Sequence, residues 1–219
     1  MSLSIAANSR ILILAAALLM AGPLHAQLTT PGLFKSLKGQ KGKSLQSKVA
    51  MSAKQVGIGL FTFHADHNKL PGEATIKSIS ETADDGVKIE AESANDCFFQ
   101  IIVGGYLDDP GVFAPDKRDG VQRNNVGLKK LEHCFFSYIP STGFDRADRP
   151  LVVAPLVKGK KTFDPKPLGG KAVVLLSDLS AHILDIDDNG VVKLQGKDLF
   201  DAGQPYWEGK PFEVKWPEK

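Results

Sequence analysis

The most regular hydrophobic pattern in the chain lies between residues 44 and 68. Apolar side chains recur there at every third or fourth position, as on one face of an amphipathic helix: Leu45, Val49, Ala53, Val56, Leu60 and Phe63. Ser44 is a suitable N-terminal cap and Pro71 follows the last periodic position, so a helix is predicted over residues 44–68. Gly57 and Gly59 each cost such a helix about 1 kcal/mol relative to alanine, which indicates that another element packs closely against them.

The middle of the chain predicts a shorter helix between loops. Residues 95–103 form an apolar run that ends at two glycines, and they predict a second helix. The polar and acidic residues 73–93 predict a surface loop or a marginal helix, and residues 115–130 predict a charged loop. A short strand is expected at residues 112–114.

The C-terminal half has the pattern of an antiparallel sheet. Residues 132–139 are rich in aromatic side chains, and residues 151–154 and 172–176 are continuous apolar runs, so all three predict strands. Residues 181–186 and 191–194 flank an Asn-Gly pair, which is typical of a β-hairpin because both turn positions favour positive φ. Helices followed by antiparallel strands predict an α+β fold, in which one long N-terminal helix packs on a small antiparallel sheet with loop-rich insertions.

The last part of the chain is rich in aromatic and proline residues. Its aromatic side chains are Tyr206, Trp207, Phe212 and Trp216. We expect this tail to pack back over an edge of the sheet, and a binding surface is the alternative interpretation.

A separate apolar run near the N-terminus predicts a targeting segment. Arg10 is the charged residue before residues 11–21, which are apolar, and Pro23 then breaks the run. This order is typical of a secretory signal, with cleavage expected after Ala26. The run is shorter than the ~20 residues of a stable membrane span, although a retained signal anchor is the alternative. We therefore expect residues 1–26 to be removed from an exported protein, periplasmic or secreted, that meets a membrane only if the segment is retained.

Composition narrows the function classes. The 219 residues are 42% hydrophobic and carry a formal net charge of +2, so the chain lacks the strongly basic character of a nucleic-acid-binding protein. Residues 27–44 alternate lysine with glycine and predict a flexible basic lead-in. Residues 45–219 are long enough for a single domain with its own core.

Export changes the interpretation of the two cysteines. Cys97 and Cys134 would both lie in a compartment where disulfides persist. A bridge between them is expected, and it would stabilise the fold by about 3–4 kcal/mol in the chain-entropy model. Two buried free thiols are the alternative, because each cysteine precedes a Phe-Phe pair.

The order of several short strings resembles a known family. These strings are Ala53-Lys54-Gln55-Val56-Gly57-Ile58-Gly59-Leu60, residues 63–71, Gly105-Tyr106-Leu107-Asp108-Asp109-Pro110, Phe113-Ala114-Pro115, residues 171–178, residues 196–201 and residues 206–210. Together they make residues 45–217 resemble the pseudopilin-like proteins of bacterial type II secretion, within the type IV pilin superfamily. The resemblance implies a non-enzymatic protein without a resident cofactor, which acts through protein–protein contacts with envelope or surface machinery.

One departure from that family changes the expected role. Subunits that assemble into pili keep an apolar helix that follows a Phe-Thr-Leu-x-Glu segment and continues into the globular head. This chain has no such segment, and its apolar run ends at Pro23, well before Ser44. We therefore expect a secreted head domain and not a filament subunit.

A calcium site is a candidate at the predicted hairpin. Asp185, Asp187 and Asn189 alternate before Gly190, as in the first half of a calcium-binding loop. The twelfth position is Gly196, where such loops have glutamate, and a plain hairpin turn explains the same residues. A calcium-stabilised extracellular module for ligand binding or adhesion is accordingly an alternative function.

Histidines provide the remaining candidate chemistry. His64 and His67 lie one helical turn apart and could bind a transition metal, if His133 or His182 supplied a third ligand. Asp178 lies four residues before His182, as in a pairing for catalysis, but the chain has no Gly-x-Ser-x-Gly elbow. A secreted hydrolase or metalloenzyme that uses His64, His67 and Asp178 is the second alternative.

Overall fold

The computed structural model describes residues 31–117, 121–140 and 143–218, and for residues 31–41 it describes the backbone alone. The expected signal segment and its cleavage position lie outside the described residues. The helical elements are α1 (Pro31–His67), η1 (Glu73–Thr75), α2 (Ile76–Ser80), α3 (Ala94–Val103), η2 (Pro110–Phe113) and η3 (Pro205–Trp207). The strands are β1 (Ser137–Tyr138), β2 (Pro150–Ala154), β3 (Lys171–Leu176), β4 (Ala181–Asp185), β5 (Lys193–Leu194) and β6 (Lys197–Asp198).

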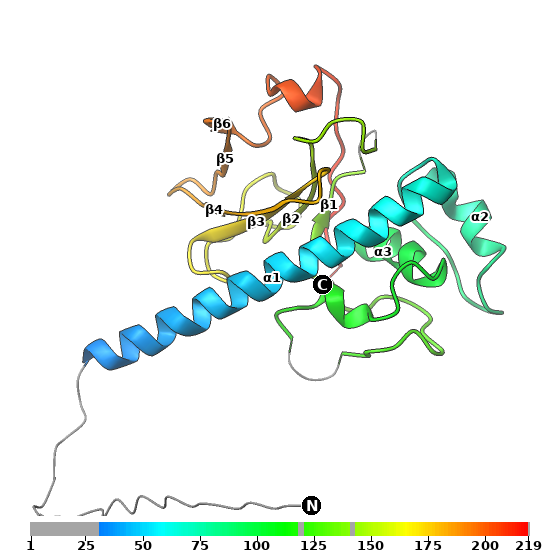
Figure 1. Ribbon diagram of the computed structural model, residues 1–219, viewed down its shortest axis with the longest axis horizontal. Coiled ribbons are helices and arrows are strands. Elements are labelled where there is room, and N and C mark those ends of the chain that lie inside the picture. Colours follow the sequence, from blue (N-terminus) through cyan, green and yellow to red (C-terminus); the bar gives the residue numbers. More distant parts are fainter. Residues whose placement is uncertain (1–30, 118–120, 141–142, 219) are drawn as a thin grey trace, which may run out of the picture.

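The predicted α+β architecture is confirmed. Four strands form one antiparallel sheet in the order β1-β2-β3-β4, and β5 and β6 form a separate two-stranded ladder. Figure 1 shows α1 crossing one face of the larger sheet. No helix within the described residues is long and apolar enough to cross a membrane.

Both faces of the two central strands, β2 and β3, are covered. Val173 and Leu175 of β3 belong to the core cluster beneath α1, whereas Ala172 and Val174 belong to a second cluster formed with the C-terminal segment. Because side chains alternate between the two faces of a strand, a strand that is covered on both sides needs apolar residues throughout. This explains why β2 and β3 are continuous apolar runs in the sequence.

Helix α1 buries the face that the periodicity predicts. Val49, Ala53, Val56, Leu60 and Phe63 are all fully buried. The close packing expected at the two glycines is also confirmed: a Cβ on Gly57 would lie 2.9 Å from Leu175, and one on Gly59 would lie 2.9 Å from Leu107.

The start of α1 differs from the prediction. The helix begins at Pro31 and not at Ser44, so residues 31–44 continue the helix where a flexible lead-in was expected. Proline is well suited to a first helical turn, lysine is a good helix former, and extending an existing helix is easier than nucleating one. In Figure 1 this part of α1 extends beyond the sheet.

Two strand predictions are wrong. Residues 112–114 fall in and after the 3₁₀ helix η2, because Pro110 begins it and the Asp109 carboxylate accepts the N–H of Gly111 at 2.8 Å. Residues 132–139 contribute only the short strand β1 to the sheet. Helix α3, by contrast, agrees with the prediction and is capped by Ser93, whose Oγ accepts the N–H of Asp96.

The predicted hairpin forms only at its turn. Ile186 pairs with Val192 across the Asn-Gly turn, but β5 then pairs with β6 and not with β4. The cause is a second turn at Gln195 and Gly196, where both residues have positive φ (53° and 82°), as in the tightest hairpins.

The aromatic tail packs on the domain, as expected. Tyr206 and Trp207 are buried in the cluster on the outer face of the sheet. Lys215 exchanges two backbone hydrogen bonds with Tyr138, at 2.9 and 2.7 Å, which extends the sheet beyond β1.

Candidate interaction surface

The solvent side of α1 carries large apolar side chains. Met51 is 66% exposed, Ile58 is 55% exposed and Phe61 is 50% exposed. A helix that buries one face normally presents polar residues on the other, so these three side chains depart from the pattern. Met51 and Ile58 lie seven residues apart, which places them on the same side of the helix about 10 Å apart along its axis.

A groove runs beside Ile58, and we call it the α1 groove. It has a volume of about 240 Å³ and is lined by Gln55, Ile58, Leu107, Asp109 and Val112. Three of these five residues are aliphatic, and the two polar ones can pair with polar groups of a ligand. Its walls are fixed in place, because Leu107 packs closely on Gly59 and the Asp109 carboxylate caps η2.

Phe61 has a packing partner within the domain. Its ring meets that of Phe144 edge-on at a centroid distance of 5.2 Å, and His64 contacts the same Phe144 ring at 5.4 Å. The position of the Phe61 side chain is therefore explained in part by its contact with Phe144 inside the domain. Met51 and Ile58 are the more exposed pair and define the candidate surface together with the α1 groove.

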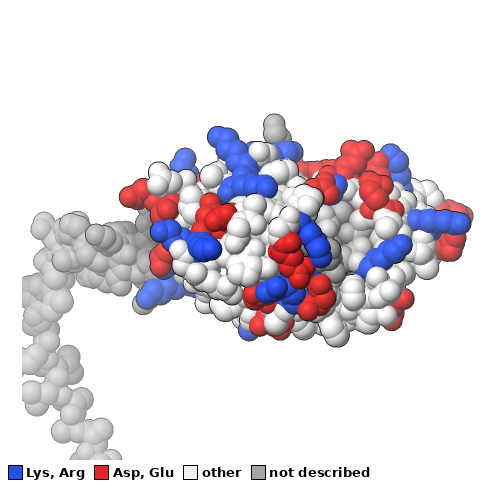
Figure 2. Space-filling view, turned by 90° about the horizontal axis from the view of Figure 1, so that it is seen from above, with Lys and Arg blue, Asp and Glu red and all other residues white. Residues whose placement is uncertain are grey.

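On the face that Figure 2 displays, charge does not single out another surface. Figure 2 shows basic and acidic side chains interspersed on the face that it displays, without a broad region of one sign. This face therefore does not resemble the basic stripe of a nucleic-acid-binding protein.

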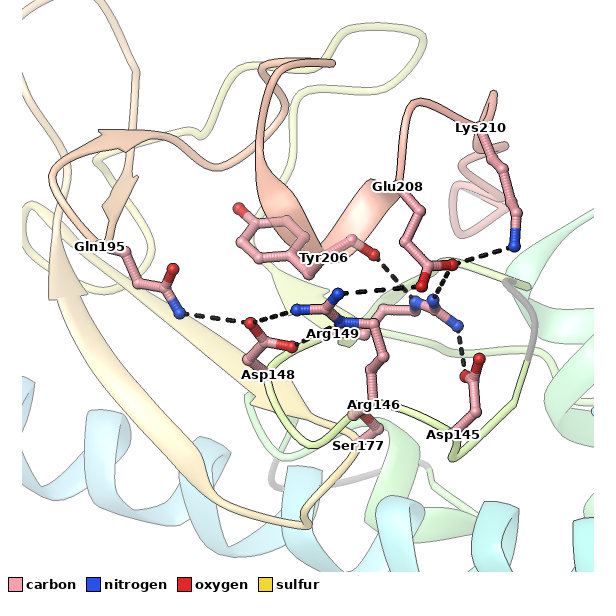
Figure 3. Close-up of polar contacts among 9 residues, drawn as sticks. All are labelled: Asp145, Arg146, Asp148, Arg149, Ser177, Gln195, Tyr206, Glu208 and Lys210. Atoms are coloured by element: carbon pink, nitrogen blue, oxygen red, sulfur yellow. Dashed lines mark hydrogen bonds and ion pairs between the residues drawn. The ribbon is translucent and has the colours of Figure 1, made fainter.

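A buried arginine joins two distant parts of the chain. Arg149 is 2% exposed; its Nη1 lies 2.6 Å from Asp145 Oδ1, its Nη2 lies 3.2 Å from Glu208 Oε2, and its Nε donates to the Tyr206 carbonyl at 3.1 Å (Figure 3). The contacts connect the loop before β2 to the segment around η3. A buried guanidinium needs such partners, because an unpaired buried charge is costly.

Further ion pairs surround Arg149. Arg146 donates two hydrogen bonds of 3.1 Å to the Asp148 carboxylate, and Lys210 lies 2.9 Å from Glu208 (Figure 3). The bond from Arg146 lowers the pKa of Asp148, and the bond from Lys210 lowers the pKa of Glu208. This cluster was not predicted from the sequence, although the string Asp145-Arg146-Ala147-Asp148-Arg149 indicates a loop rich in ion pairs.

The predicted disulfide is absent from the described residues, where Cys97 and Cys134 are both free thiols. The two sulfur atoms face different partners: Cys97 Sγ contacts the Ala91 carbonyl at 3.8 Å and Cys134 Sγ contacts the Phe136 carbonyl at 3.3 Å. Burial raises the pKa of each thiol to about 12, so both stay protonated and unreactive at neutral pH.

The candidate histidines have separate partners. His67 Nε2 lies 3.1 Å from the Tyr106 hydroxyl, and its ring contacts Phe63 at 4.4 Å. His182 Nε2 lies 2.9 Å from Ser180 Oγ in the turn between β3 and β4, and Asp178 accepts the backbone N–H of Ser180. His133 lines a different cavity, of about 410 Å³, beside residues 127–132.

Two of the three candidate calcium ligands, Asp185 and Asp187, have partners within the domain. Asp185 Oδ1 lies 2.5 Å from Lys171 Nζ of the neighbouring strand. Asp187 Oδ1 accepts the N–H groups of Asn189 and Val191, at 2.9 and 2.8 Å, which is a side-chain-stabilised turn. The Asp187 contacts are those expected of the plain turn, and calcium binding remains a prediction. Across the part of the chain that the structure describes, no three His, Cys, Asp or Glu side chains are grouped so that they could hold a metal ion.

Comparison of the chain with protein-family models, with curated proteins and with solved structures found no match. Function is therefore inferred from the geometry of the domain itself. Two features stand out in that geometry: the exposed Met51–Ile58 row with the α1 groove, and the Arg149 cluster, whose members are used in holding the fold together.

Proposed function

We propose that the chain is an exported, non-enzymatic, pseudopilin-like domain that acts through protein–protein contact with envelope or surface machinery, and that it binds its partner at the α1 groove. The exposure of Met51 and Ile58 beside that groove is the observation that carries the proposal. A long helix packed on a small antiparallel sheet is also the architecture that the family resemblance implies.

The partner that fits this surface is an amphipathic helix. Apolar side chains at positions 51 and 58 of α1 repeat over two helical turns, and a partner helix lying alongside α1 would contact both. One of its apolar side chains would enter the α1 groove between Leu107 and Val112, while Gln55 and Asp109 would meet its polar groups. Fully burying a side chain of this size contributes about 1.5–3 kcal/mol.

The enzymatic alternative receives less support from the contacts. It requires His64, His67 and Asp178 to act together, but the phenol of Tyr106 binds His67 and the backbone of Ser180 binds Asp178. The Ser180–His182 contact lacks the third member of a hydrolase triad, because Asp178 does not bond to the imidazole among the contacts described.

Site-specific photocrosslinking in intact cells tests the proposal. A photoreactive residue at position 58 should give a discrete adduct with one envelope protein, and the same residue at Lys193, an exposed position on β5, should not. Met51→Glu should abolish the adduct without changing the melting temperature, since Met51 is largely exposed. Equal labelling from positions 58 and 193 would overturn the proposal.

A further inference from the structure

The exposed side of α1 has a regular pattern of its own. Starting from Lys48, exposed residues follow at steps of three, three, four and three positions: Met51, Lys54, Ile58 and Phe61. Residues at this spacing lie on one side of a helix, so the two lysines belong to the same row as the apolar side chains. Lys54 stands between Met51 and Ile58, and a partner that covers both of them has to pass over its side chain.

The lysines of α1 have no acidic partner within the helix. Between Pro31 and Ala65 the helix contains neither aspartate nor glutamate, and its six lysines are Lys35, Lys38, Lys41, Lys43, Lys48 and Lys54. The chain as a whole is nearly balanced, with 27 Lys and Arg residues against 25 Asp and Glu residues, so this excess of positive charge is local. Acidic residues placed four positions from lysines would stabilise the helix, and α1 lacks them up to Ala65.

The rest of the described domain does not neutralise the row either. Among the ion pairs formed within residues 31–117, 121–140 and 143–218, none involves Lys48 or Lys54. By contrast, Lys171 and Lys210 do pair with carboxylates of the domain. The two ammonium groups of the row are therefore open to carboxylates from outside the domain.

The charge changes sign at the groove end of the row. Asp109 lines the α1 groove with its side chain 47% exposed and 3.7 Å from Arg123, and the neighbouring Asp108 is exposed. A partner thus meets lysines near Met51 and carboxylates near the groove. A uniformly anionic surface such as a membrane would repel these carboxylates, whereas a helix can carry different charges at its two ends.

We propose that the partner at the α1 groove is an acidic amphipathic helix, whose carboxylates pair with Lys48 and Lys54 while its apolar side chains cover Met51 and Ile58. This inference rests on the function proposed above, and it adds the charge of the partner and the position of that charge. The acidic end of the partner helix lies over the start of the row, and no acidic side chain of the partner faces Asp109. Complementary charges of this kind select a partner and set its orientation more than they add affinity.

Charge reversal in the crosslinking experiment tests this proposal. With the photoreactive residue at position 58, Lys48→Glu/Lys54→Glu should lower the yield of the adduct about tenfold, because two ion pairs are replaced by two repulsions. Lys158→Glu/Lys197→Glu is the matched control, since both lysines are exposed and lie outside α1, and it should label like the original chain. Both variants should keep the melting temperature of the original chain, because all four side chains are exposed.

A charge swap then identifies the contact. Replacing the acidic residues of the crosslinked partner helix with lysine should restore the yield with Lys48→Glu/Lys54→Glu and lower it with the original chain. An unchanged yield in Lys48→Glu/Lys54→Glu overturns the acidic helix but leaves the proposed function standing, because position 58 still reaches its partner. A chain that gives no adduct from position 58 contradicts the proposed function itself, and the acidic helix with it.

Flotation with lipid vesicles separates a protein partner from a membrane. The full chain is mixed with phosphatidylcholine vesicles that contain about 30% phosphatidylglycerol, and Lys48→Glu/Lys54→Glu should leave the floating fraction unchanged. A fall in the floating fraction of this variant, together with lipid adducts from position 58, would assign the row to an anionic membrane and overturn the proposal.

Discussion

Arg149 is the residue through which the loop before β2 and the segment around η3 are held together. Replacing it with alanine removes its pairs with Asp145 and Glu208 and its bond to the Tyr206 carbonyl, and it leaves a buried space. We expect Arg149→Ala to lower the free energy of unfolding by about 3 kcal/mol, measured by urea denaturation.

Lys210→Ala is the control for this prediction. Lys210 pairs with the same Glu208 but its side chain is 61% exposed, so its loss should cost less than about 1 kcal/mol. Equal losses from the two variants would show that Arg149 contributes no more than a surface ion pair.

Two carboxylates of this cluster make the free energy of unfolding depend on pH in the acidic range. Hydrogen bonds from Arg146 and from Lys210 lower the folded-state pKa of Asp148 and of Glu208 below their ordinary values of 3.8 and 4.5. A group with a lowered folded pKa stabilises the fold above its unfolded pKa, and this contribution is lost as the pH falls through the folded pKa. We expect the free energy of unfolding to fall below about pH 4.5, and to fall less steeply in Asp148→Asn/Glu208→Gln. Identical pH profiles would contradict the prediction.

At the scale of elements, the glycines of α1 respond in opposite directions to the same substitution. Gly57→Ala places a methyl group 2.9 Å from Leu175, so it should destabilise the domain by about 1–3 kcal/mol despite the better helix propensity of alanine. Gly42 lies in the same helix with no atom within 4 Å of an added Cβ, so Gly42→Ala should stabilise it by up to about 1 kcal/mol. Thermal unfolding of the two variants is the measurement, and shifts of the same sign would contradict the packing at Gly57.

The elements that could be predicted from the sequence are those in which burial in the core sets the spacing of the apolar residues. The apolar residues of α1 repeat as on one face of a helix, and the continuous apolar runs of β2 and β3 are typical of buried strands. Residues 112–114 are too short to distinguish a strand from a 3₁₀ helix, since the deciding contact is the Asp109 cap. The partner of β5 depends on the turn at Gln195, which has a positive φ. Glutamine rarely adopts positive φ, so this turn could not be predicted from the sequence.

The candidate surfaces were harder to predict than the fold. Met51 and Ile58 look like ordinary helix residues in the sequence, and their significance depends on which face α1 buries. The α1 groove requires Leu107 to lie against Gly59, a contact between distant positions. Arg149 and Glu208 are also far apart in the chain, so their pairing follows only from the tertiary structure.

At the scale of the whole molecule, the backbone of the first part of α1 extends beyond the sheet (Figure 1). The packing contacts described for α1 begin at Leu45, which touches the core, and at Gln46, which donates to the Leu168 carbonyl at 2.8 Å. The free energy of unfolding of a chain that starts at residue 44 should therefore lie within about 1 kcal/mol of that of a chain that starts at residue 27. Urea denaturation compares the two, and a larger loss would mean that residues 27–43 pack on the domain.

The pairing of residues 214–218 with the middle of the chain has a consequence for how the protein comes to be folded. The Trp216 carbonyl accepts the N–H of Ala94, Lys215 pairs with Tyr138, and the N–H of Glu218 donates to Asn95. During vectorial synthesis or translocation, the start of α3 and the outer edge of β1 lack these partners until the last of these residues emerges. Contacts between such distant positions form slowly. A chain whose last residues have not yet emerged therefore stays partly unfolded for longer, which is the state that the export we propose would require.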